Sequence, residues 1–150
     1  MEYTTIIKAF EKLSTEELYQ IMKLRIEVFI IEQQCLYQDA DDKDQKCHHL
    51  MLLKDETLVA YARLVPAGLS FPEVSIGRVI TSAGVRGTGA GKVLMNAAIE
   101  ACKNIFGPVP IRIGAQTYAK NFYTGLGFED TGIAFLEDDI PHIEMLYNFS

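Results

Sequence analysis

The chain has 150 residues and a formal net charge of −6. That length suits one domain with its own core, and 49% hydrophobic with 23% charged residues is typical of a globular protein. We therefore expect a single domain over residues 1–150. The acidic balance argues against a nucleic-acid partner, which needs a concentrated basic face. Because no apolar run reaches membrane-spanning length and the first residues do not resemble a signal peptide, we expect no membrane contact and a cytoplasmic location.

The cysteines support a reducing compartment. Cys35, Cys47 and Cys102 are odd in number and form no Cys-x-x-Cys pair. Cys47-His48-His49 invites a zinc interpretation, but no second pair has the spacing of metal ligands. We expect no metal site.

The N-terminal part predicts a strand followed by a helix. Thr4–Phe10 is β-branched and apolar, and Ser14-Thr15-Glu16-Glu17 forms a capping box before an apolar stripe with helical spacing that reaches Phe29. Arg25 falls on the apolar face of this helix. Such an arginine needs a carboxylate or a ligand, so both a structural ion pair and contact with a substrate are open for Arg25.

Residues 33–48 are polar and have no periodicity, which predicts a long loop that is functional or disordered. The aspartates in it suggest calcium. However, an EF-hand loop starting at Asp39 would place Asp44 where glycine is needed and Leu50 at the twelfth, glutamate position. A solvated acidic loop is the favoured interpretation.

The remaining elements alternate between strands and helices. Gly77 and Gly114 each interrupt a predicted strand, which suggests a bulge or a close backbone approach. The predicted order is βαβββαβαββ. The strands are His49–Lys54, Leu58–Val65, Val74–Thr81, Ile111–Gln116, Phe128–Phe135 and His142–Tyr147, and the helices are Val93–Ile105 and Tyr118–Leu126.

A glycine-rich turn, Arg86-Gly87-Thr88-Gly89-Ala90-Gly91-Lys92, joins a predicted strand to a predicted helix. Glycines at alternate positions allow positive φ angles, and the helix start adds unpaired N–H groups, so the turn suits a phosphate. A P-loop would need a glycine in place of Arg86 and a hydroxyl residue in place of Val93, and a dinucleotide fingerprint would need a glycine in place of Lys92. ATP, GTP and dinucleotides are therefore disfavoured, while a connector without a ligand stays open.

The pattern Arg-x-x-Gly-x-Gly resembles the acyl-coenzyme A loop of the GCN5-related N-acetyltransferases (GNAT), and residues 121–128, Asn-Phe-Tyr-Thr-Gly-Leu-Gly-Phe, resemble a second segment of that superfamily. The resemblance implies an α/β (α+β) fold with a mixed central sheet of about six or seven strands, splayed at the cofactor site and flanked by helices. Stretches along nearly the whole chain resemble the ElaA-type branch: Leu24-Arg25, Val28-Phe29, Glu32-Gln33, Tyr37-Gln38-Asp39, His48-His49, Gly77-Arg78-Val79, Gly114-Ala115-Gln116 and Ile140-Pro141-His142-Ile143.

The resemblance further implies acetyl-CoA as cofactor. Backbone groups of Val79, Ile80 and Thr81 would pair with the pantetheine amides, and Asn121 would bond the cofactor nearby or cap its own helix. The pyrophosphate would lie on the loop Arg86, Gly87, Thr88, Gly89, Ala90, Gly91 and Lys92.

Tyr123 matches the general acid of the family; packing in the core is its alternative role. Many members use a glutamate on the strand before the loop, but here its only acid, Glu73, lies at the start. His142 has the intrinsic pKa of a base, although a core or surface histidine is the alternative. Glu32 and His48 are further candidates for the base, and a water relay would need none of these residues within direct reach. Arg78 is expected either to select an acidic group on the acceptor or to pair with a nearby carboxylate. The residues expected to contact the acceptor are Arg25, Glu32, His48, Arg78 and Gln116.

These features predict an N-acetyltransferase that acts on a primary amine of a small molecule or protein. The alternative is a non-catalytic coenzyme A-binding sensor or interaction module. A homodimer is open, because a symmetric interface leaves no periodic pattern in the sequence.

Overall fold

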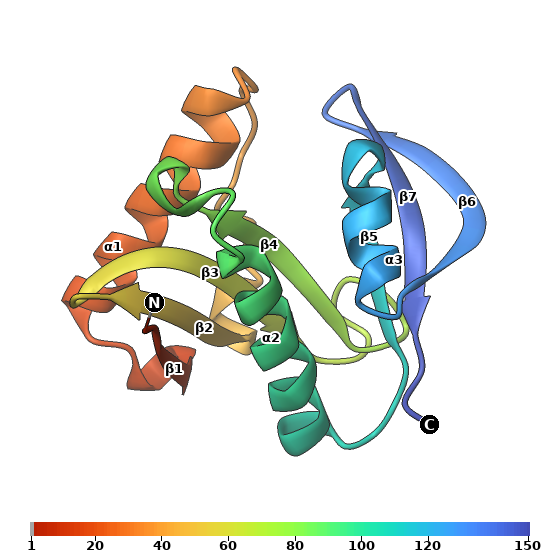
Figure 1. Ribbon diagram of the computed structural model, residues 1–150, viewed down its shortest axis with the longest axis horizontal. Helices are drawn as coiled ribbons and strands as arrows, with labels where there is room; N and C mark the ends of the chain where they lie inside the picture. Colours follow the sequence, from red (N-terminus) through yellow and green to blue (C-terminus); the bar gives the residue numbers. More distant parts are fainter. Residues whose placement is uncertain (1) are drawn as a thin grey trace.

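The structure is a computed structural model that describes residues 2–150 (Figure 1). It has two antiparallel sheets, and the element order matches the predicted one. The first sheet has the order β1 (Thr4–Ala9), β2 (His48–Lys54), β3 (Thr57–Val65) and β4 (Ser75–Thr81), and the second has the order β5 (Ile111–Gln116), β7 (Ile140–Tyr147) and β6 (Glu129–Glu137).

Helices cover both faces of the first sheet. The capping box that starts α1 (Thr15–Arg25) is present: Ser14 Oγ accepts the N–H of Glu17 at 3.0 Å, and the Glu17 carboxylate accepts the N–H of Ser14 at 2.8 Å. The helix continues as a π-helix over Ile26–Glu32.

Strand β3 alternates between the two covered faces, as a strand of period two must. Tyr61 packs with Ile21 and Leu24 of α1, whereas Ala60 and Ala62 belong to the core under α2 (Ala90–Phe106). This double burial explains why the β3 sequence is a nearly continuous apolar run.

The two sheets meet at one point and then diverge. Val74 forms a parallel bridge with Ile111, and its carbonyl accepts the N–H of Arg112 at 2.9 Å. The Arg112 guanidinium also holds Glu73 at 2.9 and 3.0 Å, so the acid at the start of β4 serves this junction. Beyond it β4 and β5 separate, which confirms the predicted splaying (Figure 1).

The bulge predicted in β4 is present. The register against β3 shifts between Tyr61 and Arg63, opposite Ile80 and Gly77. The positive φ falls on Arg78 (+49°) instead of on Gly77. Contacts of the Arg78 side chain, described below, hold this uncommon backbone conformation.

The short helix α3 (Lys120–Gly125) packs beside β5 and β6, and its Tyr123 belongs to the main core. Within residues 2–150, no helix is long and apolar enough to cross a membrane.

Candidate functional site

A cleft of about 1030 Å³ lies where β4 and β5 diverge, and residues of both sheets line it. Half of the residues predicted to act on ligands line it. The predicted residues that line the cleft are Glu32, Arg78, Val79, Ile80, Thr81, Arg86, Gln116, Tyr123 and His142.

The glycine loop at the start of α2 has the conformation expected of an anion site. Gly87 and Gly89 have φ of +79° and +88°, and Gly89 is the N-cap of the helix. Within residues 2–150, several backbone N–H groups here donate no hydrogen bond; they belong to Gly87, Gly89, Ala90, Gly91 and Lys92. Unpaired N–H groups at the positive end of a helix bind phosphate.

The cleft-facing edge of β4 has no partner strand beyond Val74. The Ser82 N–H bonds the Val59 carbonyl of the neighbouring strand at 2.8 Å. Because successive residues of a strand point their backbone groups to opposite edges, those of Ile80 also face β3, while those of Val79 and Thr81 face the cleft. The geometry thus assigns the Ile80 backbone to the sheet, against the prediction that it pairs with the cofactor.

Tyr123 extends from α3 into the cleft and is nearly buried, with 9% of its surface exposed. Its ring packs edge-on against Phe122 and Phe128, with centroid distances of 5.1 and 5.8 Å. The hydroxyl makes no hydrogen bond with any residue that the structure describes, and burial raises the pKa of the phenol to about 12. The side chain is therefore part of the core and presents a neutral hydroxyl, able to donate a hydrogen bond, to the cleft.

His142 has a defined tautomer. Nδ1 lies 2.7 Å from the Ile140 carbonyl, and because a carbonyl only accepts, Nδ1 carries the hydrogen. Nε2 therefore has the free lone pair, 3.6 Å from a Glu137 carboxylate oxygen. The ring stacks on Phe135 at 5.2 Å. The arrangement can accept a proton at Nε2 and stabilise the resulting cation with Glu137.

Two predicted cleft residues are held by protein partners. Glu32 forms an ion pair with Arg86 at 2.6 Å, and Arg86 also donates to the Thr81 carbonyl at 2.8 Å. Gln116 donates to the Gln33 side chain at 3.3 Å.

Two further residues lie outside the cleft. Asn121 is exposed, and it is the second residue of α3, whose N-cap is Ala119, so the alternative that Asn121 caps this helix is wrong. His48 packs its ring edge-on against Phe106 of α2, at 6.1 Å. The predicted ligand contacts of Asn121 and His48 stay predictions.

Arg25 has no exposed surface and no position in the cleft. Its Nε binds the Asp39 carboxylate at 2.8 Å, and Nη1 binds the Asp44 carboxylate at 2.8 Å. The ion-pair interpretation of Arg25 is confirmed, and direct contact with a substrate is wrong because no part of the side chain is accessible.

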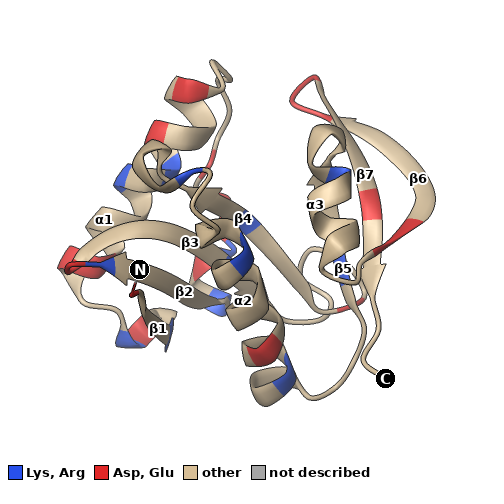
Figure 2. Ribbon diagram, in the orientation of Figure 1, with Lys and Arg blue, Asp and Glu red and all other residues tan. Residues whose placement is uncertain are grey.

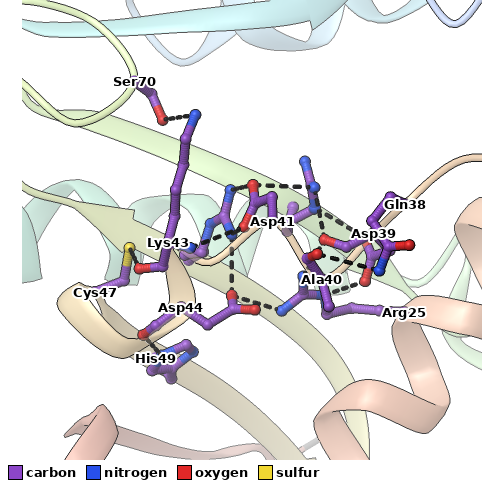
Figure 3. A network of polar contacts seen from close by, with 12 residues as sticks. Arg25, Gln38, Asp39, Ala40, Asp41, Lys43, Asp44, Cys47, His49 and Ser70 are labelled. Carbon is purple, nitrogen blue, oxygen red and sulfur yellow. Dashed lines mark hydrogen bonds and ion pairs between the residues drawn. The ribbon is translucent and has the colours of Figure 1, made fainter.

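Two aspartates of the acidic loop are correspondingly not solvated, contrary to the prediction, whereas Asp42 is exposed. Asp39 and Asp44 are buried beside Arg25 (Figure 3), and Arg63 and Arg78 complete a balanced network with Asp41. Arg63 binds Asp41 and Asp44 at 2.8 and 3.0 Å, and Arg78 binds Asp39 and Asp41 at 2.8 and 3.3 Å. Arg63 is not among the predicted site residues, although an arginine inside the apolar run of β3 indicates a buried carboxylate partner.

The network controls the ionisation of its acids. Burial opposes the charge on Asp41, but hydrogen bonds and attraction from Arg63 and the attraction of Arg78 outweigh it and lower its pKa below the usual range. Burial is likewise outweighed at Asp44 by Arg25 and Arg63, so its pKa is also lowered. Both aspartates are ionised at neutral pH.

Two antiparallel sheets that diverge over a glycine loop at a helix N-terminus define the acyl-CoA N-acyltransferase fold, in which acyl groups are transferred from coenzyme A. Residues 11–149 match the family model described as an acetyltransferase (GNAT) domain. The chain therefore belongs to the GNAT acetyltransferase family.

Individual proteins agree with this assignment. Protein ElaA of Escherichia coli is 40% identical over 136 residues, which is 89% of each chain, and its crystal structure matches with a TM-score of 0.91 over 98% of this chain and 100% of that one. The crystal structure of an acyl-CoA N-acyltransferase from Pseudomonas aeruginosa has a TM-score of 0.91 at 38% identity, covering 97% and 99% of the two chains. An aminoglycoside 6'-N-acetyltransferase complexed with coenzyme A shares the fold at a TM-score of 0.70 and 15% identity, over 95% of this chain and 96% of that one.

Proposed function

We propose that the protein is an acetyl-CoA-dependent N-acetyltransferase that acetylates a primary amine of a small molecule or protein. One observation carries the proposal: the unpaired phenol of Tyr123 and the unpaired edge of β4 lie along one cleft, beside a loop of unpaired N–H groups. A coenzyme A-binding site needs all three, because pyrophosphate, pantetheine and thioester each require polar partners.

The residues present fit the cofactor. N–H groups of the glycine loop would hold the pyrophosphate, and the backbone groups of Val79 and the Thr81 N–H would pair with the pantetheine amides, since the Thr81 carbonyl already accepts from Arg86. The coenzyme A complex of the aminoglycoside N-acetyltransferase, which has the same fold, supports this fit. The thioester supplies an acetyl group activated for attack by an amine.

The amine must lose a proton before it attacks. An alkylammonium of pKa near 10.4 is deprotonated at pH 7 at a cost of about 4.6 kcal/mol, so a base contributes directly to the rate. His142 Nε2 takes this proton in our proposal, with Glu137 stabilising the imidazolium. A new C–N bond then forms and the C–S bond breaks.

Tyr123 acts on the departing thiolate. A phenol of pKa about 12 gives its proton to a thiolate of pKa about 8.5 only at a cost of roughly 5 kcal/mol. Tyr123 therefore stabilises the developing charge on sulfur by donating a hydrogen bond. The nitrogen releases a second proton as the amide forms, and the coenzyme A thiolate takes up this proton to become the thiol.

Free-thiol release across a panel of amines tests the proposal, with Tyr123→Phe compared with Tyr19→Phe. Tyr19 is exposed on α1 outside the cleft, so its variant controls for loss of a phenol. We expect Tyr123→Phe to lower kcat by about a hundredfold with little change in coenzyme A affinity, because only one transition-state hydrogen bond is lost. Equal rates in the two variants would remove the role of Tyr123. Tight coenzyme A binding without turnover of any amine would favour the non-catalytic binding module.

Free thiols support the proposed cytoplasmic location. Cys35, Cys47 and Cys102 are all unpaired in the structure, as a reducing compartment requires.

A further inference from the structure

Among the described residues, one cation that lines the cleft lacks a counter-charge. Four lysine and arginine side chains within residues 2–150 line the cleft: Arg63 and Arg78 bind aspartates, and Arg86 binds Glu32. The fourth, Lys43, is half-buried, and its ammonium bonds only the Ser70 hydroxyl, at 3.3 Å, among the residues that the structure describes.

The neighbouring network cannot neutralise Lys43. Arg25, Arg63 and Arg78 match the charges of the three aspartates one to one, and the aspartates direct their oxygens at these guanidinium groups. Figure 3 shows Lys43 extending away from those carboxylates toward Ser70. The backbone of Lys43 is fixed, since its N–H bonds Asp41 at 3.2 Å and its carbonyl accepts the Cys47 thiol at 3.2 Å.

The opposite wall of the same cleft has the reverse charge. Glu137 and Asp138, at the tip of the hairpin between β6 and β7, line the cleft beside His142, and Figure 2 marks this tip as acidic. Apart from the His142 contact, neither carboxylate has a basic partner within residues 2–150. An ammonium group would be favoured here, where the proposed base takes its proton.

An aromatic floor connects the two walls. A Cβ placed on Gly114 would lie 3.1 Å from the ring of Phe135 and 3.8 Å from the ring of Phe71, so both rings converge on this glycine of β5. Phe135 stacks on His142, and Phe71 follows Ser70, the partner of Lys43. The two charged ends therefore lie on either side of one apolar surface.

We infer that the acceptor is a small amine that also carries a carboxylate, with an apolar chain between the amine and the carboxylate. This inference rests on the proposed function and names its substrate class. The amine lies at His142 and Glu137, the apolar part lies on Phe71 and Phe135, and the carboxylate pairs with Lys43 and Ser70. The fixed backbone of Lys43 makes its ammonium a prearranged partner for that carboxylate.

Kinetics on matched amines test the inference. Amino acids that carry the amine and the carboxylate at opposite ends of an unbranched chain are compared with their carboxamides and with the amines that lack the carboxylate. Because the chain separates the two ends, the ammonium pKa is nearly the same in the three kinds of amine, so a preference cannot come from it. The protein variants are Lys43→Met and, as matched control, Lys46→Met, which removes an exposed lysine of the same loop outside the cleft.

We expect KM for the best amino acid to be at least roughly tenfold lower than for its two analogues, since a charge-assisted hydrogen bond is lost in both. Lys43→Met should abolish this preference at nearly constant kcat on the decarboxylated amine, and Lys46→Met should keep it. Turnover without a carboxylate preference, or a preference that survives Lys43→Met, overturns the inference and leaves the proposed function standing.

A binding measurement decides the case in which no amine turns over. Calorimetry of the same amines is performed on the full chain saturated with coenzyme A. Carboxylate-dependent binding that disappears in Lys43→Met supports the inference although catalysis is disproved. Equal binding of the three kinds of amine, or binding of none, overturns it.

Discussion

Two polar segments of this chain, the acidic loop of residues 33–47 and the glycine loop of residues 86–92, look equally ready to bind an ion but differ in how far their polar groups are satisfied. In the acidic loop, Asp39, Asp41 and Asp44 are all bound to arginines. In the glycine loop, the N–H groups of Gly87, Gly89, Ala90, Gly91 and Lys92 donate to no residue that the structure describes. The contrast shows that unsatisfied polar groups, more than polar residues as such, mark a ligand site.

Removal of Arg25, the arginine of α1 that binds the acidic loop, should have the largest effect on stability or ligand affinity of the changes below. We expect Arg25→Met to lower the free energy of unfolding by about 3–5 kcal/mol, because Asp39 would remain buried with one arginine and Asp44 with another. Denaturant unfolding monitored by circular dichroism measures this loss. Lys23→Met, on the same helix but not in the network, is the control. A loss below about 1 kcal/mol in Arg25→Met would show that the loop is not held by charge.

A substitution in the glycine loop should lower the affinity for coenzyme A, whereas the change at Arg25 lowers the stability of the fold. Gly89 has φ of +88°, so Gly89→Ala must strain or move the backbone, and we expect coenzyme A affinity to fall roughly tenfold. Gly91→Ala is the matched control: its φ is not positive, and its Cβ would meet Phe122 at an ordinary 3.5 Å. Calorimetry with coenzyme A compares the two. If both variants bind like the wild type, the nest of N–H groups does not hold the cofactor.

Acid should weaken the acidic loop in two stages. Burial lowers the pKa of His49, whose Nε2 donates to the Asp44 carbonyl, so the unfolded chain binds more protons and stability falls as the pH drops below about 6.5. The pKa values of Asp41 and Asp44 are also lowered in the folded state. Their stabilisation is present above about pH 4 and is lost as the pH falls further.

Unfolding midpoints between pH 8 and pH 2.5 measure this dependence. Asp41→Asn should flatten the acid limb, whereas Asp42→Asn, an exposed neighbour without an ion pair among the described residues, should leave its slope unchanged. An acid limb of equal slope in the two variants would contradict the assignment of Asp41 to the network. The effect of Asp41→Asn is expected to be smaller than those of Arg25→Met and Gly89→Ala, because Arg63 and Arg78 each keep another aspartate partner.

Local signals predicted most of the fold. The capping box at Ser14 and Glu17, the turn before α2 and the bulge in β4 all depend on residues close in sequence, and all are present. The bulge illustrates the limit of such signals. Gly77 predicts the position of the bulge, but the positive φ lies on Arg78. The Arg78 side chain forms ion pairs with Asp39 and Asp41, which are far away in the chain.

The candidate site was only partly predictable for the same reason. Tyr123, His142 and the glycine loop were found by motif, and the structure places the two side chains in one cleft. For Arg25 and Arg78 the sequence leaves open an acceptor contact or an ion pair, and the structure shows that their partners are aspartates of the acidic loop. Lys43 was not singled out at all, since nothing near it in sequence distinguishes it from Lys46.

The sequence by itself determined the order of the elements, the family and the conformation of the glycine loop. Caps, glycine φ angles and hydrophobic periodicity act within a few residues, so they can be recognised without knowing the fold. Only the tertiary structure decided which charges are neutralised and which remain free. The arginine–aspartate contacts join residues 14 to 39 positions apart, and the energy of a charge depends on what surrounds it in space.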